Sequence, residues 1–152
     1  MKVTMKKAVV EDAKIVAGLA IQMWKSHTMD ELTEEFCEYI EGERCAVFLS
    51  MVDGKVIGFA QCGLRHDYVE GTDTSPVGYL EGIFVTEEYR NKGVAKDMLE
   101  ACQVWAKAQG CTEFASDCEL DNTVSREFHL KVGFEEANRI ICFKKRLVDS
   151  FD

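Results

Sequence analysis

The sequence predicts a single α/β domain in which helices cover a mixed sheet. Three observations support this prediction. The chain has 152 residues, 47% of them hydrophobic, which is enough to bury one core. Apolar residues recur at strand spacing in some segments and at helical spacing in others. Strand-like and helix-like segments are interleaved, and the single proline, Pro76, marks no interdomain linker. We therefore expect residues 1–152 to form one domain.

The first half of the chain predicts a strand, two helices and a hairpin. The spacing of Ile15, Leu19 and Met23 is typical of an amphipathic helix. The pair Asp53-Gly54 joins two apolar runs and is suited to the positive φ angles of a tight reverse turn. The predicted elements are a strand within 2–10, helices over 11–24 and 30–41, and strands near 44–52 and 55–65.

The second half begins with a polar loop, "HDYVEGTDTSPVG", and continues with alternating strands and helices. The run "YLEGIFV" predicts a buried strand that carries one out-of-place acid, Glu81. An ionised carboxylate is costly there unless it is paired or solvated, which favours a functional role. The predicted elements are a strand at 79–85, a helix over 92–109, a strand at 112–118, a helix at about 122–132 and a closing strand at 139–147.

The charge balance excludes one class of partner and favours another. The formal net charge is −9, with 27 acidic and 18 basic residues, whereas a nucleic-acid binder needs a concentrated positive face. The short basic run "FKKRL" is typical of a solvated strand edge. A cationic small molecule suits the acidic whole better than nucleic acid.

The seven cysteines indicate a reducing compartment. Their number is odd, they form no CxxC pair, and most lie in apolar runs, so we expect buried thiols and neither a disulfide framework nor a metal site. No N-terminal segment has the pattern of a signal peptide, and no apolar run approaches the ~20 residues of a membrane span. We expect a cytoplasmic protein with no membrane partner.

The junction between the strand at 79–85 and the helix after it has the features of a phosphate site. The first N–H groups of a helix lack intrahelical partners and carry partial positive charge, so they bind phosphate when the chain before them approaches closely. Gly93 permits that approach, Ala95 is small, and Arg90, Lys92 and Lys96 add full charges. The pattern R-x-x-G-x-A fits a pyrophosphate, while the spacing fits neither a Walker loop nor a Rossmann fingerprint.

This arrangement resembles the acetyl-coenzyme A site of the GCN5-related N-acetyltransferase (GNAT) superfamily, whose Q/R-x-x-G-x-G/A motif joins a strand to a helix. The resemblance implies a central, mostly antiparallel sheet with helices on both faces and one splayed parallel strand pair. It implies acetyl-coenzyme A as cosubstrate and no metal. By carry-over, the cofactor-binding residues are Ile83, Phe84, Val85, Arg90, Asn91, Lys92, Gly93, Val94, Ala95, Lys96 and Asn122.

Within that superfamily the chain is similar over almost its full length to aminoglycoside 6'-N-acetyltransferases. The matching stretches include "YVEGTDTSPVGYLEGIFVTEEYR", "WAKAQGCTEFASD", "LDN" and "GFEEANRIICFKK". Aminoglycosides are polycations, so carboxylates attract them and aromatic rings can stack on their sugars or contact their ammonium groups. By carry-over, the substrate-binding residues are Trp24, His27, Tyr68, Glu81, Asp117 and Asn138.

The same resemblance assigns catalytic roles and shows two departures. Glu81 is the candidate base that accepts the amine proton, and the N–H of Ile83 would stabilise the oxyanion. His129 stands where many members have a tyrosine that protonates the departing sulfur, and a histidine can do the same or simply pack in its helix. Asn138 stands where relatives often have a substrate-binding glutamate, which affects substrate range more than reaction type.

These features lead to one main hypothesis and two alternatives. The main hypothesis is acetyl transfer from acetyl-coenzyme A to the 6'-amine of an aminoglycoside by direct attack in a ternary complex, which confers resistance. The first alternative is another primary amine as acceptor, such as a polyamine or a peptide N-terminus. The second is a non-catalytic acyl-coenzyme A sensor. We also expect a homodimer, because many relatives are dimers and the closing strand offers an edge.

Overall fold

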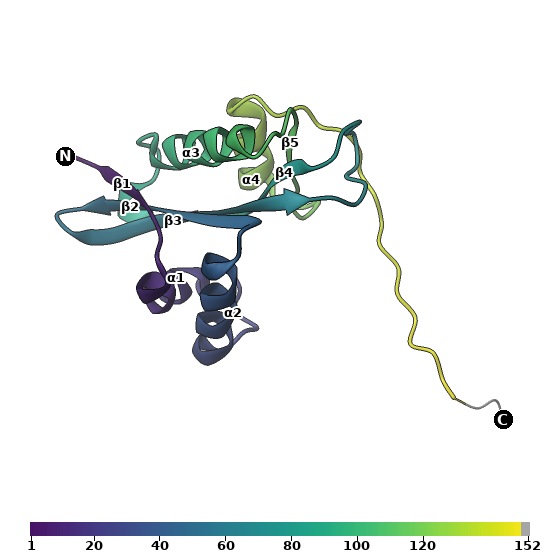
Figure 1. The fold of residues 1–152 in the computed structure, drawn as a ribbon, viewed down its shortest axis with the longest axis horizontal. Coiled ribbons are helices and arrows are strands. Elements are labelled where there is room, and N and C mark those ends of the chain that lie inside the picture. Colours follow the sequence, from purple (N-terminus) through teal and green to yellow (C-terminus); the bar gives the residue numbers. More distant parts are fainter. Residues whose placement is uncertain (150–152) are drawn as a thin grey trace.

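The computed structural model describes residues 1–149 as a five-stranded sheet with helices on both faces (Figure 1). The strands are β1 (Thr4–Lys7), β2 (Cys45–Val52), β3 (Lys55–Arg65), β4 (Val77–Val85) and β5 (Phe114–Ser116). The helices are α1 (Ala13–Ala20), α2 (Met29–Glu41), α3 (Val94–Ala108) and α4 (Thr123–Lys131), with 3-10 turns at Val10–Asp12 and Glu87–Tyr89.

The strand order follows the chain, β1-β2-β3-β4-β5. Pairing is antiparallel from β1 to β4, whereas β4 and β5 run parallel. The predicted fold class, a mostly antiparallel mixed sheet with one parallel pair, is therefore confirmed.

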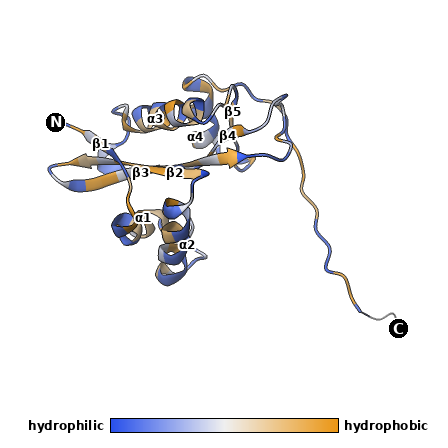
Figure 2. Ribbon diagram, viewed as in Figure 1, coloured by the Kyte–Doolittle hydropathy of each residue, from blue (hydrophilic) through white to orange (hydrophobic). Residues whose placement is uncertain are grey.

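Two apolar layers hold the helices to the sheet, as the view in Figure 1 shows, with α1 and α2 on one face and α3 and α4 on the other. On the α1–α2 face the rings of Phe36 and Phe59 lie 5.8 Å apart between helix and sheet. On the α3 face, the fully buried side chains of Met98 and Cys102 pack in the second apolar cluster with Ile57. Figure 2 shows apolar residues along the central strands and mixed polar and apolar residues in the helices.

Local signals explain where the elements begin and turn. Helix α2 starts with a capping box, in which Thr28 Oγ1 accepts a hydrogen bond from Glu31 N and Glu31 Oε1 accepts one from Thr28 N. The β2–β3 turn has positive φ angles at Asp53 and Gly54, as the sequence predicts.

The predicted closing strand is wrong for the described residues. Beyond α4 the chain to residue 149 forms no helix or strand, and Figure 1 shows it leading away from the body. Ile140, Phe143 and Leu147 are 67%, 89% and 86% exposed. Residues 140–143 do form an apolar run, but this run has no strand partner among the described residues of the chain. Strand β5 is correspondingly short, and α4 has no buried residue.

Candidate active site

Strand β4 has a bulge at Glu81. Opposite it, Cys62 of β3 pairs with Leu80 and Gln61 pairs with Gly82, so Glu81 is the extra residue in β4. A bulge disrupts the ladder locally and re-aims a side chain. This is how an acid in an otherwise apolar strand comes to face a cavity without being buried in the core.

On its other edge β4 separates from β5 after three residue pairs, of which Leu80 with Ser116 is the last. Strand β4 continues to Val85, so its edge from Glu81 onward has no strand neighbour on the β5 side in the described part of the chain. The predicted cofactor-contacting residues Ile83, Phe84 and Val85 lie on this segment. Backbone groups on an unpaired edge are available to a ligand.

The predicted pyrophosphate segment leads from β4 into α3. Asn91 and Gly93 have φ angles of 61° and 82°, in the left-handed region, and α3 begins at Val94. A Cβ atom built at Gly93 meets no atom within 4 Å, so the space in front of the helix start is open. Lys92 and Lys96 are exposed beside it. Arg90 donates from Nε to Val85 O at 2.7 Å and so ties this loop to the end of β4.

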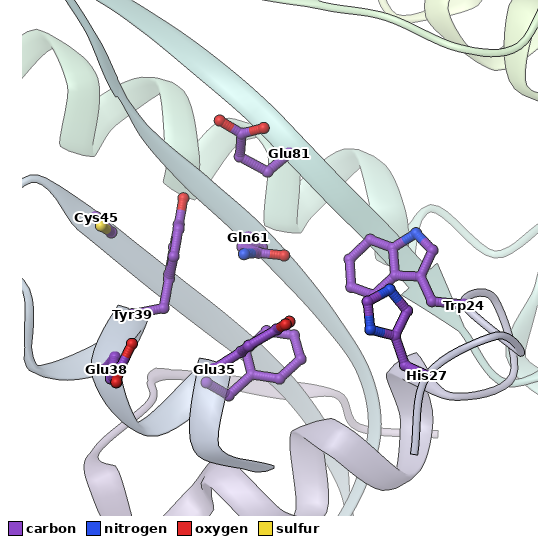
Figure 3. A pocket seen from close by; sticks show the side chains of 9 residues that line it. Trp24, His27, Glu35, Glu38, Tyr39, Cys45, Gln61 and Glu81 are labelled. Atoms are coloured by element: carbon purple, nitrogen blue, oxygen red, sulfur yellow. The ribbon is translucent and has the colours of Figure 1, made fainter. Parts of the chain in front are cut away.

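A cavity of about 600 Å³ lies on the α2 face of the sheet (Figure 3). Trp24 and His27 enter it from the segment between α1 and α2, and Glu81 enters from β4. Gly82, the neighbour of Glu81, lies beneath the indole of Trp24. The remaining lining residues, which the sequence did not single out, are Glu35, Phe36, Glu38, Tyr39, Cys45 and Gln61.

Two polar atoms in this lining have no hydrogen-bond partner among the described residues. They are the hydroxyl of Tyr39 and Oε1 of Gln61, and both are inaccessible to solvent. Burial raises the pKa of Tyr39, and the neighbouring Cys45 and Glu81 add to that shift, so the hydroxyl keeps its proton. The three glutamates that line the same cavity, Glu35, Glu38 and Glu81, favour a cationic ligand.

Glu81 and Asp117 are connected through two residues that the sequence analysis did not single out. The guanidinium of Arg65 binds both oxygens of Glu81, with Nη2 at 2.7 Å from Oε1 and Nε at 3.2 Å from Oε2. Its carbon Cζ lies 3.5 Å from the centre of the Tyr79 ring, and the Tyr79 hydroxyl donates to Asp117 Oδ2. The hydrogen bonds to Glu81 raise the pKa of Arg65, and burial, with the Asp117 hydrogen bond, raises that of Tyr79.

Tyr68 and Asn138 do not line the cavity, but they belong to neighbouring segments. Tyr68 is 75% exposed, and its hydroxyl accepts a hydrogen bond from Gly71 N. Asn138 donates from Nδ2 to Glu70 Oε1 at 2.8 Å. The 68–71 loop is therefore held against the segment around Asn138, outside the cavity that Trp24, His27 and Glu81 share.

His129 and Asn122 are both engaged within α4 and its surroundings. His129 Nδ1 lies 2.7 Å from Ser125 O, and Nε2 lies 2.8 Å from Ser116 Oγ. A carbonyl only accepts, so Nδ1 carries a proton, whereas the bond between Nε2 and the Ser116 hydroxyl can run in either direction. Asn122 Oδ1 caps α4 by accepting from Ser125 N, which leaves its amide nitrogen for a ligand.

The described residues contain no group of three or more potential metal ligands and no helix long and apolar enough to span a membrane. All seven cysteines are free.

Comparisons with known proteins cover nearly the whole chain. Residues 13–134 match the model of the acetyltransferase (GNAT) family. The chain is 45% identical over 129 residues to the aminoglycoside N(6')-acetyltransferase type 1 of Salmonella typhimurium, covering 85% of this chain and 89% of the relative. It is 38% identical over 148 residues to the enzyme of that name from Stenotrophomonas maltophilia, covering 97% and 95%.

Solved structures give the same picture. The aminoglycoside N-acetyltransferase AAC(6')-Iy in complex with CoA has a TM-score of 0.92 and 40% identity, covering 96% of both chains. AAC(6')-Iy in complex with the bisubstrate analogue CoA-S-monomethyl-acetylneamine also has a TM-score of 0.92, at 39% identity, covering 97% of this chain and 100% of that one. The likeness therefore extends well beyond the strand-to-helix junction.

Proposed function

The chain belongs to the GNAT acetyltransferase family, and we propose from this premise that it transfers an acetyl group from acetyl-coenzyme A to the 6'-amino group of aminoglycosides. The observation that carries the proposal is the position of Glu81. It is the bulged residue of β4, it faces the cavity on the α2 face, and the unpaired edge of β4 follows it directly. Acetylation removes a positive charge from the antibiotic, and the reaction thereby confers resistance.

Acetyl-coenzyme A is bound as a cosubstrate by the open helix start and by the unpaired strand edge. Residues 90–96 hold the pyrophosphate through the first N–H groups of α3, with Arg90, Lys92 and Lys96 supplying charge. The backbone of Ile83 and Val85 contacts the pantetheine and the acetyl carbonyl. The amide nitrogen of Asn122 faces the same arm.

The acceptor is bound by the cavity and its rim. Trp24 offers a ring face to a sugar, and Glu81 offers a carboxylate to an ammonium group. His27 lies beside Trp24, and Asp117 is connected to Glu81 through Tyr79 and Arg65. Tyr68 and Asn138 form an outer contact that a large acceptor reaches from the cavity.

Direct attack requires a neutral amine. Glu81 accepts the proton of the 6'-ammonium group, directly or through water, and the nitrogen lone pair forms the C–N bond at the acetyl carbonyl. The N–H of Ile83 stabilises the oxyanion, the C–S bond breaks, and coenzyme A leaves as a thiolate that takes up a proton. His129, whose Nε2 lies 2.8 Å from Ser116 Oγ, is the candidate donor of that proton.

A thiol-release assay tests this function. Purified protein and acetyl-coenzyme A are mixed with kanamycin or tobramycin, with an aminoglycoside that has a hydroxyl in place of the 6'-amine, with spermidine, and with short peptides. We expect release only with the 6'-amino compounds. Release with spermidine or peptides alone would identify a different acceptor, and binding of coenzyme A without release from any amine would identify a sensor.

We also propose that the protein is a cytoplasmic homodimer in which the segment 139–148 pairs with a second copy. This segment is exposed and apolar at Ile141, Phe143 and Val148, and it carries four cations, Arg139, Lys144, Lys145 and Arg146. The loop between β5 and α4 is acidic, with Asp117, Glu119 and Asp121, and α4 has no buried residue. If the segment 139–148 paired as a strand with that region of a second copy, its apolar side chains would be buried and its cations would lie near the acidic residues.

A further inference from the structure

Arg65 ends β3 beside the proposed acceptor site, and the reaction described above gives it no role. Its guanidinium forms a bidentate contact with Glu81, in which two N–H groups donate to the two carboxylate oxygens. Arginine makes this contact because its planar guanidinium matches the geometry of a carboxylate. The face of the same guanidinium lies on Tyr79, which is 5% exposed and well held. Arg65 is thus fixed by a ring behind it and a carboxylate in front of it.

The carboxylate that the acceptor's ammonium group needs is therefore already bound by a cation. Both oxygens of Glu81 accept hydrogen bonds from Arg65, so an ammonium group entering the cavity must share or replace those bonds. The side chains of Arg65 and Glu81 are 43% and 28% exposed. Water reaches both partners, so solvent can take up the hydrogen bonds of the guanidinium when an ammonium group replaces Arg65 at the carboxylate.

We propose that Arg65 is an exchangeable counter-ion of the acceptor site, which holds Glu81 in position in the acceptor-free protein and gives up the carboxylate when an ammonium group of the acceptor arrives. This inference rests on the proposed function, since it concerns the same site. Arg65 is a positioning residue, because it acts through Glu81 and not on the reacting atoms.

The proposal predicts opposite changes in affinity and in turnover. Removing Arg65 removes the internal competitor, so the acceptor binds at lower concentration. The same change leaves Glu81 without the bidentate contact that orients it, so kcat falls. A residue that only stabilises the fold would lower both affinity and turnover, or neither, and would not separate them.

The test compares wild-type protein with Arg65→Gln and Arg65→Lys by thiol release and by calorimetric titration with tobramycin. We expect Arg65→Gln to lower KM and Kd by about two- to fivefold, the factor that an exposed ion pair is worth, while kcat falls. Arg65→Lys keeps the charge but loses the bidentate contact with Glu81, so it should lower the Kd for tobramycin by less than Arg65→Gln does. Arg126→Gln, which removes an equal charge from the surface pair with Glu136, serves as the matched control and changes neither constant.

A second background separates exchange from simple charge repulsion. In Glu81→Gln protein, Arg65 has no carboxylate to occupy, so adding Arg65→Gln leaves the calorimetric Kd unchanged. A Kd that still falls there, or one that stays level or rises in the single Arg65→Gln variant, overturns the proposal. If Arg65→Gln does not fold, Arg65→Lys decides, and a Kd at or above the wild-type value refutes it. Failure of wild-type protein to acetylate tobramycin would instead refute the proposed function.

Discussion

The indole of Trp24 lies on the backbone of Gly82, so closely that a Cβ atom at Gly82 would come 2.9 Å from Trp24 Cη2. Gly82→Ala therefore displaces the ring from the cavity. We expect KM for tobramycin to rise about tenfold, the effect of roughly 1.4 kcal/mol, with little change in coenzyme A binding. The control is Gly18→Ala in α1, where an added Cβ meets nothing within 4 Å, and an unchanged KM in Gly82→Ala would refute the placement of Trp24.

Glu81→Gln removes the proposed base and keeps the shape of the side chain. We expect kcat to fall by about 100-fold or more, the usual contribution of a general base, while coenzyme A binds as in wild-type protein. Thiol release and calorimetry measure the two effects separately. Glu100→Gln on the exposed side of α3 is the matched control, and full activity of Glu81→Gln would rule out its role as base.

Gly93 is held at a φ of 82°, which an L-residue adopts only with strain. Gly93→Ala should lower the free energy of unfolding by about 1–2 kcal/mol in urea titrations. Gly93→Asn tolerates this conformation better and adds a side chain in the open space before α3, so it should keep the fold and weaken coenzyme A binding. Normal coenzyme A affinity in Gly93→Asn would place the pyrophosphate elsewhere.

The closing segment is the proposed dimer contact. Light scattering of wild-type protein should give twice the 17.2 kDa mass of the chain, and the double change Ile141→Ser with Phe143→Ser should give a monomer. The replacement Val104→Ser, at another exposed apolar residue on α3, controls for a loss of surface hydrophobicity. A monomeric wild-type protein would contradict the dimer.

Asp12 links β1 to the turn before α1 and gives stability a pH dependence. Burial acts to raise the pKa of its carboxyl, but the hydrogen bond from Val9 N and the ammonium of Lys6 outweigh burial and lower the pKa. A lowered folded-state pKa contributes stability above the unfolded value, near 4, and loses it as pH falls through the folded value. Asp12→Asn should cost about 1 kcal/mol at pH 7 and much less at pH 3 in urea titrations; an equal cost at both would refute the linkage.

Most of the fold was predictable because local signals and the hydrophobic pattern agree. The Asp53-Gly54 turn, the acidic opening turn of α2 and the apolar stripe of α3 each specify an element without reference to distant residues. The closing strand was predicted wrongly for a physical reason. A short apolar run such as residues 140–143 is consistent with a strand, but it does not say which sheet, or which copy of the chain, provides the partner.

Without the family resemblance, the candidate site was predictable only where a residue contradicts its surroundings. Glu81 is conspicuous as an acid in an apolar strand, and the structure brings it together with Trp24 and His27. Glu35 and Glu38 lie on the polar side of an amphipathic helix, where solvated acids are ordinary. Arg65 looks like any charged strand end. The role proposed for Arg65 depends on the β4 bulge that directs Glu81 toward it. A bulge depends on how two strands pair, so the sequence of one strand does not reveal it.

Strands β4 and β5 pair over only three residues, so the sheet that separates the two proposed binding sites is interrupted beyond Leu80. Helix α3, where we propose that the carrier binds, lies on the opposite face of the sheet from α2, which lines the cavity (Figure 1). We therefore expect the two reactants to approach from opposite faces and to meet where β4 leaves β5. Changes in α2 can then alter which antibiotics are accepted while the grip on the acyl carrier stays as it is. Drug range and catalytic competence are, in this architecture, free to diverge under selection.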